Sequence, residues 1–306
     1  MPAVTDGRTF LALAGFLVCA ALPLTAVRAS PLSGSFSLGA EYDSNVSIDE
    51  TDLNARQGDA AALVSASVDL KAVNTKSVTL NLGYSYDGTF RQNIKQYDLD
   101  IHQALAGLAV KRGKASFNLD YKFAYIRLDG GSFLNLNYVS PSLSGFISDR
   151  TYARLGYSYL KKVYKISDDL DAETRTVSFD VYRLFAGRKG YVAIGLRQDH
   201  ENATGPQFDY RARQASVRAM VPFRLVGAPI KLRLSYAYGE RDYQNETPSI
   251  GERRAEKRST YGVALDVPLI RRLTFKPSFR YVDRTSNVPL FDYREHTING
   301  VLQYRL

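Results

Sequence analysis

Side chains that could carry out catalysis are few in this sequence. It contains three histidines, His102, His200 and His296, and one cysteine, Cys19. A serine or cysteine nucleophile needs a general base, usually histidine, within hydrogen-bond distance. Serines are numerous, but no spacing sets one of them apart beside a histidine. We therefore predict that the protein is not an enzyme and has no catalytic residue.

Metal-ligating residues are equally scattered. No group of His, Cys, Asp and Glu has the spacing of a zinc site. Asp168, Asp169 and Asp171 could hold calcium loosely, but a solvated acidic loop accounts for them more simply. We expect no metal ligand and no cofactor.

The elements that must position the charged residues are β-strands. From Gly34 to the C-terminus, apolar and polar residues alternate with the period of two that strands show. In 78–87, for example, Val, Leu, Leu, Tyr and Tyr alternate with Thr, Asn, Gly, Ser and Asp. We expect about 14 such strands, the last ending at Leu306 and pairing with the first, because a closed barrel leaves no exposed edge.

The connections between these strands separate two fold classes. Short turns at 74–76, 112–113, 187–190 and 227–228 alternate with polar loops at 47–59, 88–96, 164–172, 201–209, 242–256 and 285–292. Strict alternation of short and long connections is typical of a barrel that crosses the outer membrane, where the apolar face meets lipid and the polar face lines a lumen. A soluble β-sandwich explains neither the alternation nor the terminal strand. The sequence thus predicts an all-β, transmembrane, antiparallel up-and-down outer-membrane β-barrel.

The first residues predict export. Residues 10–24 are an apolar run that is too short for a membrane-spanning helix, and small residues follow before Ser30. We expect a signal peptide at 1–29, cleaved on export, and one barrel domain at 30–306 in the cell outer membrane of a Gram-negative bacterium. The net charge of +9 would otherwise suggest nucleic-acid binding, which export makes improbable. The expected partners are outer-membrane lipid and the barrel-assembly machinery.

The alternation also predicts which charges face the lumen. If the apolar face points outward, Asp69, Asp87, Asp120, Asp180 and Asp266 point inward. So does a basic set that is concentrated on the later strands: Lys122, Arg154, Arg218, Arg224, Lys231, Arg233, Lys276, Arg280 and Arg305. Such a wall would either attract anionic solutes or an acidic polymer, or form salt bridges that only stabilise the barrel. Side chains fill the interior of a barrel of about eight strands, and the diameter grows with the number of strands. A barrel of about 14 strands should therefore leave a path for water through its lumen.

Two local features bear on the type of channel. Pro141 and a change of phase between Tyr138 and Leu143 predict a bulge or bend, and make 130–147 the one candidate for a segment folded into the lumen. Gly34, Gly39 and Gly300 lie in the first and last strands and have no side chains to pack, so the pairing of these two strands should be weak. A weak pairing there would favour a lateral gate.

Both ends of the barrel resemble a known family. The segment from Pro277 to Thr297 looks like the last hairpin of the surface lipoprotein assembly modifiers, the Slam family. The residues that carry this likeness are Tyr42, Asp43, Ser44 and Asn45 at the start, and Ser286, Asn287, Pro289 and Tyr293 at the end.

The resemblance implies a 14-stranded translocon that passes a surface lipoprotein or a small secreted protein across the outer membrane. Members of that family carry a periplasmic domain of helical repeats, so a separate periplasmic repeat protein would have to handle the exported client here. Three alternatives remain open: a passive, anion-preferring porin, a polysaccharide export channel, and a structural or adhesive surface protein that works through its long loops.

Overall fold

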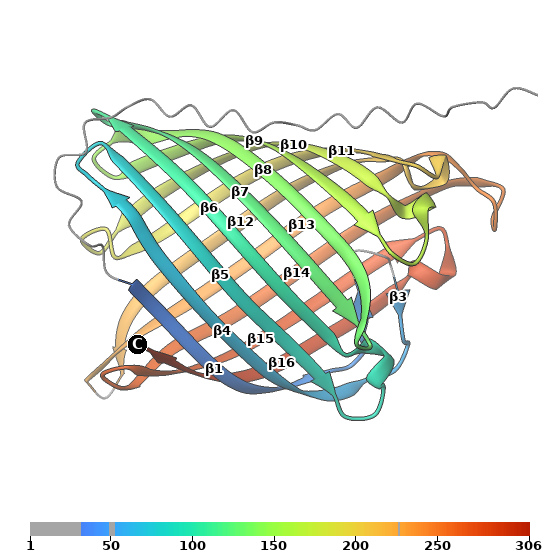
Figure 1. Cartoon of the computed structure of the whole chain (residues 1–306), viewed down its shortest axis with the longest axis horizontal. Helices are drawn as coiled ribbons and strands as arrows, with labels where there is room; N and C mark the ends of the chain where they lie inside the picture. Colours follow the sequence, from blue (N-terminus) through green and yellow to red (C-terminus); the bar gives the residue numbers. More distant parts are fainter. Residues whose placement is uncertain (1–31, 49–52, 226) are drawn as a thin grey trace, which may run out of the picture.

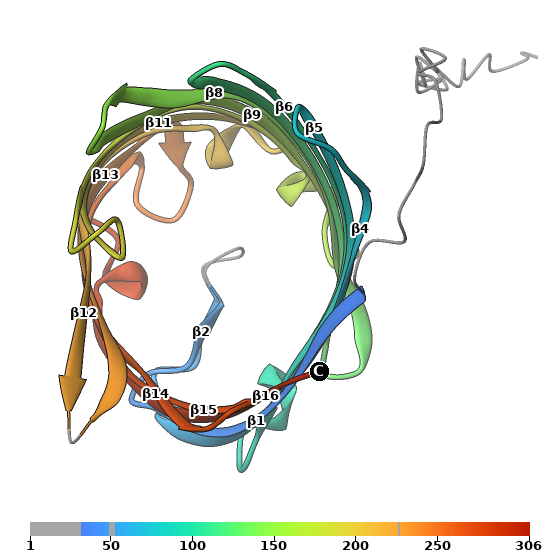
Figure 2. The same cartoon turned by 90° about the vertical axis from the view of Figure 1, so that its left-hand side faces the viewer.

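A computed structural model describes residues 32–48, 53–225 and 227–306, so the expected signal peptide at 1–29 lies outside the described residues. Fourteen antiparallel strands close into one barrel, as Figures 1 and 2 show. Its strands are β1 (Leu32–Asp43), β4 (Asp59–Asn74), β5 (Val78–Arg91), β6 (Leu99–Arg112), β7 (Ala115–Leu128), β8 (Gly131–Ser148), β9 (Thr151–Tyr164), β10 (Ala172–Phe185), β11 (Gly190–Ala203), β12 (Tyr210–Leu225), β13 (Ala228–Thr247), β14 (Glu252–Ile270), β15 (Leu273–Ser286) and β16 (Tyr293–Arg305). Two short strands, β2 (Ser47–Ile48) and β3 (Leu53–Asn54), pair only with each other. In the described part of the chain no helix is both long and apolar enough to cross a membrane.

The two faces of the barrel wall differ in polarity. Large apolar side chains on the outer face are exposed, among them Ile194 at 59%, Leu155 at 54% and Val177 at 53%. The alternate positions on the same strands face inward and are mostly small, polar or charged residues, with several tyrosines among them. A band of exposed apolar residues around a polar interior is the pattern of a barrel whose outer face contacts lipid.

The barrel closes where β1 meets β16. The pairing runs without interruption from Ser35 opposite Arg305 to Asp43 opposite Thr297. A Cβ atom on Gly39 would lie 2.7 Å from Val301 Cγ2 and 2.8 Å from the Gly300 carbonyl oxygen. Glycine therefore permits a close approach of the two strands. The seam that the sequence suggested to be weak is continuous.

The two rims of the barrel are built differently. One, here called the turn rim, carries tight connections such as Gly113–Lys114 and Asp149–Arg150, whereas the opposite loop rim carries most of the longer ones. The expected strict alternation is wrong at one place, because Asp129 and Gly130 form a two-residue turn on the loop rim, both with positive φ. The expected loop at 242–256 is also mostly strand, since β13 runs to Thr247 and β14 begins at Glu252.

The bulge predicted near Pro141 is not present. The register of β8 with β7 and with β9 is the same on both sides of Pro141, and the Ser140 hydroxyl donates to the Tyr157 carbonyl oxygen at 3.2 Å. Instead, β8 shows register shifts near its two ends. The apparent change of phase arises because the inward positions Leu134 and Leu136 are apolar. Leu134 belongs to an apolar cluster on the inner face of the wall, and Leu136 packs against that cluster.

Candidate functional site

The connection between β1 and β4 folds into the barrel, as Figure 2 shows for β2. Val46 is 1% exposed and Ile48 is 7% exposed. Ile48 belongs to a buried apolar cluster whose other members come from the inner faces of β7, β8 and β9: Ala124, Ile126, Phe133, Leu134 and Tyr164. We call β2, β3 and their described flanks (44–48 and 53–57) the rim hairpin. The expectation that 130–147 folds inward is wrong, because β8 stays in the wall and supplies the apolar surface on which the hairpin packs.

Short helical turns on the loop rim lie against the same cluster. Tyr97 from η1 (Lys95–Tyr97) and Leu170 from η2 (Asp168–Leu170) both pack on it. Burial there raises the pKa of the Tyr97 hydroxyl above its usual value. Residues from the loops thus enlarge the apolar cluster that holds the rim hairpin.

Polar contacts hold the other side of the rim hairpin to the end of the barrel. The Ser47 hydroxyl donates to Glu295 Oε2 at 2.7 Å, and Arg56 Nη2 donates to the Pro289 carbonyl oxygen at 2.9 Å. The Ser44 hydroxyl accepts a hydrogen bond from the His296 backbone N–H at 2.9 Å. The rim hairpin is therefore fixed at two places, on β7–β9 and beside β16.

The residues that carry the family resemblance meet near this second anchor. In the first motif, Asp43 Oδ1 accepts from the Asn45 N–H at 3.0 Å, and the ring of Tyr42, on the outer face, lies 6.4 Å from that of His296. In the second, the Asn287 side chain accepts from the Ala255 N–H at 2.9 Å. Pro289 begins the turn η4 (Pro289–Phe291), the Ser286 hydroxyl accepts from the Val288 N–H at 3.1 Å, and Tyr293 begins β16. These contacts are structural, since they shape the loop rim where the first and last strands join.

A repeated turn on the loop rim escaped the sequence analysis. The turns η1, η2, η3 (Pro206–Phe208) and η4 each end on an aromatic residue or leucine that is followed by aspartate: Asp98, Asp171, Asp209 and Asp292. Asp98 Oδ1 accepts from the Arg91 N–H, and Asp171 Oδ1 from the Tyr164 N–H, each at 2.6 Å. The acidic stretch at 168–171 thus includes one of these turns, and the described residues hold no cluster of His, Cys, Asp or Glu that could bind a metal. The recurring aromatic-Asp or Leu-Asp pair was the available sequence signal.

All three histidines lie on the outer face of the wall. His102 Nδ1 is 2.7 Å from the Tyr84 hydroxyl oxygen, and its ring centroid is 5.1 Å from that of Tyr86. Aromatic side chains on this outer surface match the girdles that such barrels place at the membrane interface.

The strand register places the nine predicted basic residues on the inner face. Three of them are ion-paired: Arg218 with Asp180, Arg233 with Asp266, and Arg280 with Glu295. The others have no carboxylate within 4 Å among the described residues: Lys122, Arg154, Arg224, Lys231, Lys276 and Arg305. Lys122 instead lies 5.8 Å from the centroid of the Tyr138 ring.

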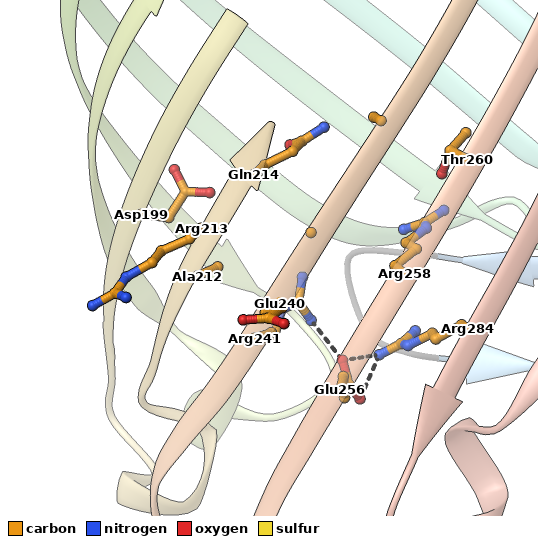
Figure 3. A pocket seen from close by; sticks show the side chains of 12 residues that line it. Asp199, Ala212, Arg213, Gln214, Glu240, Arg241, Glu256, Arg258, Thr260 and Arg284 are labelled. Atoms are coloured by element: carbon orange, nitrogen blue, oxygen red, sulfur yellow. Dashed lines mark hydrogen bonds and ion pairs between the residues drawn. The ribbon is translucent and has the colours of Figure 1, made fainter. Parts of the chain in front are cut away.

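The inner wall also carries a basic cluster that the sequence analysis missed. Arg241, Arg254 and Arg284 converge on the buried carboxylate of Glu256, and Figure 3 shows two of these contacts. Arg284 Nη2 lies 2.8 Å from both Glu256 oxygens. This cluster borders a pocket of about 170 Å³ that Arg258 also lines. It was missed because Arg254 and Glu256 lie in 242–256, which was expected to be a loop.

Aromatic rings pack against the guanidinium groups of this cluster. Arg254 Cζ lies 3.5 Å from the centroid of the Phe291 ring and 4.4 Å from that of Tyr243, while Arg241 Cζ lies 4.4 Å from that of Tyr210. Such stacking favours the charged side chains electrostatically. The Glu256 cluster is therefore a buried, closely packed and basic part of the wall near the loop rim.

Charge is distributed unevenly around the lumen. On β11–β16 the inward basic residues outnumber the inward carboxylates, among which are Asp199, Glu201, Glu256, Asp266 and Glu295. On the earlier strands, Asp69, Asp87 and Asp120 face inward as the alternation predicted. A low-dielectric wall concentrates the field of such a surface in the water between its strands.

Comparison with known proteins shows the fold. No family model matches the chain, and no curated protein matches it. Among solved structures, a loop L8 deletion mutant of OmpT, an outer membrane protein of Vibrio cholerae, aligns with a TM-score of 0.54 at 7% identity over 91% of this chain and 100% of the other. An anion-selective porin from Comamonas acidovorans aligns with a TM-score of 0.52 at 8% identity over 91% and 99% of the two chains. A bacterial polysaccharide outer membrane secretin aligns with a TM-score of 0.52 at 9% identity over 89% and 98%.

At these identities the likeness concerns architecture alone. The Slam resemblance rests on the sequence motifs and stays a prediction. The closed barrel, the exposed apolar outer face and these structural neighbours lead to one conclusion: the chain has the fold of an outer-membrane β-barrel.

Proposed function

We propose that the protein is a non-catalytic channel in the outer membrane whose basic inner wall favours anionic solutes. The observation that carries this proposal is the set of basic residues on β12–β16 with no carboxylate within 4 Å in the described chain: Arg224, Lys231, Lys276 and Arg305. A paired arginine contributes little net field at a distance, because its partner cancels the charge. An unpaired one attracts anions along the water path.

The rim hairpin also supports a channel for small solutes. It occupies part of the lumen at the loop rim and is held there by apolar packing and by hydrogen bonds. A folded protein client would have to displace it, so the geometry favours a porin-like role over Slam-like protein export. The neighbours named as a porin and a polysaccharide secretin are consistent with passage of a solute or polymer.

Charge-neutralising variants test the proposal. The mature protein would be refolded into a planar bilayer, and its reversal potential would be measured in a KCl gradient. The double variant Lys231→Gln/Lys276→Gln should lower the chloride-to-potassium permeability ratio by about a factor of two or more, because it removes two unpaired lumenal charges.

The matched control carries the same charge change on the outer face, as Arg211→Gln/Lys257→Gln. This control should leave the ratio unchanged. If both double variants shifted the reversal potential equally, or if neither did, the lumenal bases would not set the selectivity.

A further inference from the structure

A row of aromatic side chains crosses the inner wall near the turn rim. Phe146, Tyr152, Tyr182 and Tyr191 come from the adjacent strands β8, β9, β10 and β11, and the strand register turns all four inward. Their rings contact one another edge to face, with centroid separations of 5.3, 5.9 and 5.6 Å. We call these four residues the aromatic ladder. It lies inside the barrel and is distinct from the aromatic residues of the outer face.

The tyrosines of the aromatic ladder are only partly buried. Among the described residues their hydroxyl groups have no hydrogen-bond partner, so these groups face the water of the lumen. If the aromatic row served only to fill space in the wall, we would expect each tyrosine hydroxyl group to have a hydrogen-bond partner in the protein, or the rings to be phenylalanines without hydroxyl groups. The ladder therefore offers a succession of ring surfaces with polar tips.

Basic residues flank the aromatic ladder. Arg218 Cζ lies 5.7 Å from the centroid of the Tyr182 ring, and Arg188 Cζ lies 5.1 Å from that of Phe146. Arg154 follows Tyr152 by two positions and so shares its inner face. It stands opposite Asp180, but Asp180 pairs with Arg218 and Arg154 has no carboxylate within 4 Å in the described chain.

A hollow continues from the ladder onto the next strands. It has a volume of about 330 Å³ and is lined by Tyr191, Arg218, Arg233 and Arg280. Between the arginines several of the inward-facing lining residues are small: Ser235, Gly262, Ala264 and Ser278. The wall thus forms a surface in which aromatic rings lead to a recess bordered by guanidinium groups.

We propose that this surface binds short acidic saccharides, in which sugar rings carry carboxylate groups. Aromatic faces pack against the apolar faces of sugar rings, the tyrosine hydroxyl groups meet sugar hydroxyl groups, and Arg154, which has no carboxylate partner in the described chain, forms charge-assisted hydrogen bonds with a carboxylate of the saccharide. The repeated spacing of the ladder suits a chain of rings better than one isolated ring. Its hydroxyl groups suit a saccharide better than an aromatic carboxylate. This inference deepens the proposed function, because it names the class of anion that the channel carries.

Current blockade by defined ligands tests the inference. With the refolded protein in a planar bilayer, trigalacturonate should reduce the current at lower concentration than the neutral trisaccharide maltotriose or the aromatic anion benzoate. Tyr182→Ala and Arg154→Gln should each raise the concentration for half-maximal block about tenfold, which corresponds to about 1.4 kcal/mol. Tyr182→Phe keeps the aromatic ring and should raise the concentration for half-maximal block by a smaller factor than Tyr182→Ala. Tyr157→Ala removes an outward tyrosine of the neighbouring strand β9 and should leave this concentration unchanged.

The outcomes separate this inference from the proposed function. An anion-selective channel that trigalacturonate does not block, or that benzoate blocks more strongly, would overturn the inference and leave the proposed function standing. A cation-selective or non-conducting barrel would overturn the proposed function. In that case binding can still be measured without current, because the chain has no tryptophan and a Tyr182→Trp variant supplies one fluorophore in the ladder. A change in its fluorescence with trigalacturonate but not with maltotriose would support the inference, and no change would overturn it.

Discussion

Glu256 is the carboxylate on which the arginines of the late strands converge. Its side chain is 4% exposed, as are those of Arg254 and Arg284. Removing one partner from a buried ion pair leaves uncompensated charge in a medium that solvates it poorly, which typically costs about 3–5 kcal/mol. We expect Glu256→Gln to lower the free energy of unfolding by an amount of that order. Urea titration in detergent, followed by the gel mobility of folded and unfolded barrels, measures it.

A control for this prediction lies on the neighbouring strand. Glu240 is exposed on the outer face and accepts a hydrogen bond from the Tyr238 hydroxyl. Glu240→Gln should therefore have little effect on stability. Equal losses in the two variants would mean that convergence of the arginines on Glu256 does not stabilise the wall.

The sequence was informative about single residues only where the alternation is regular. Lys231, Arg233 and Lys276 lie in unbroken strands, so their inward direction follows from the period of two. Which bases would be neutralised could not be predicted, because a pair such as Arg233 and Asp266 depends on the register between two strands. Arg254 and Glu256 were missed for a local reason, since their polar segment resembles a loop although it extends the barrel.

At the scale of elements, the rim hairpin depends on one apolar contact far from it in sequence. Ile48 packs with residues of β7, β8 and β9. A carboxylate there would be buried without a partner. We expect Ile48→Asp to release the rim hairpin from its seat and to raise the single-channel conductance, while Ile48→Val, which keeps the apolar contact, should leave conductance near the wild-type value. Single-channel recording of the three proteins measures this, and a conductance unchanged by Ile48→Asp would show that the hairpin does not restrict the path.

The inward fold of this hairpin was beyond sequence analysis. Residues 47–59 are polar and have the composition of one more rim loop. The surface that receives them is assembled from strands far away in the sequence, which begin at Ala115, Gly131 and Thr151. The signal was present only indirectly, in the apolar inward positions of β8 that looked like a change of phase. The strands themselves were predictable because each follows a simple alternation, and the observed pairing of β1 with β16 confirms the expected closure.

For the whole molecule, three structural features together support the proposed channel. The 14-stranded barrel is wide enough to leave a lumen, the rim hairpin takes up part of it, and the later strands line it with more basic than acidic residues. Part of the net charge of +9 therefore lies on the inner wall of the later strands. Residues such as Lys231 and Lys276 face the lumen, where we propose that they attract anions.

The reversal potential of the wild-type protein tests this account most directly. In a planar bilayer with a tenfold KCl gradient at low total salt, we expect a potential of the sign that indicates chloride preference. The preference should weaken as the salt rises to 1 M, where the screening length falls to about 3 Å. A potential near zero, or one of the opposite sign, at low salt would contradict the claim that the basic wall selects the solute.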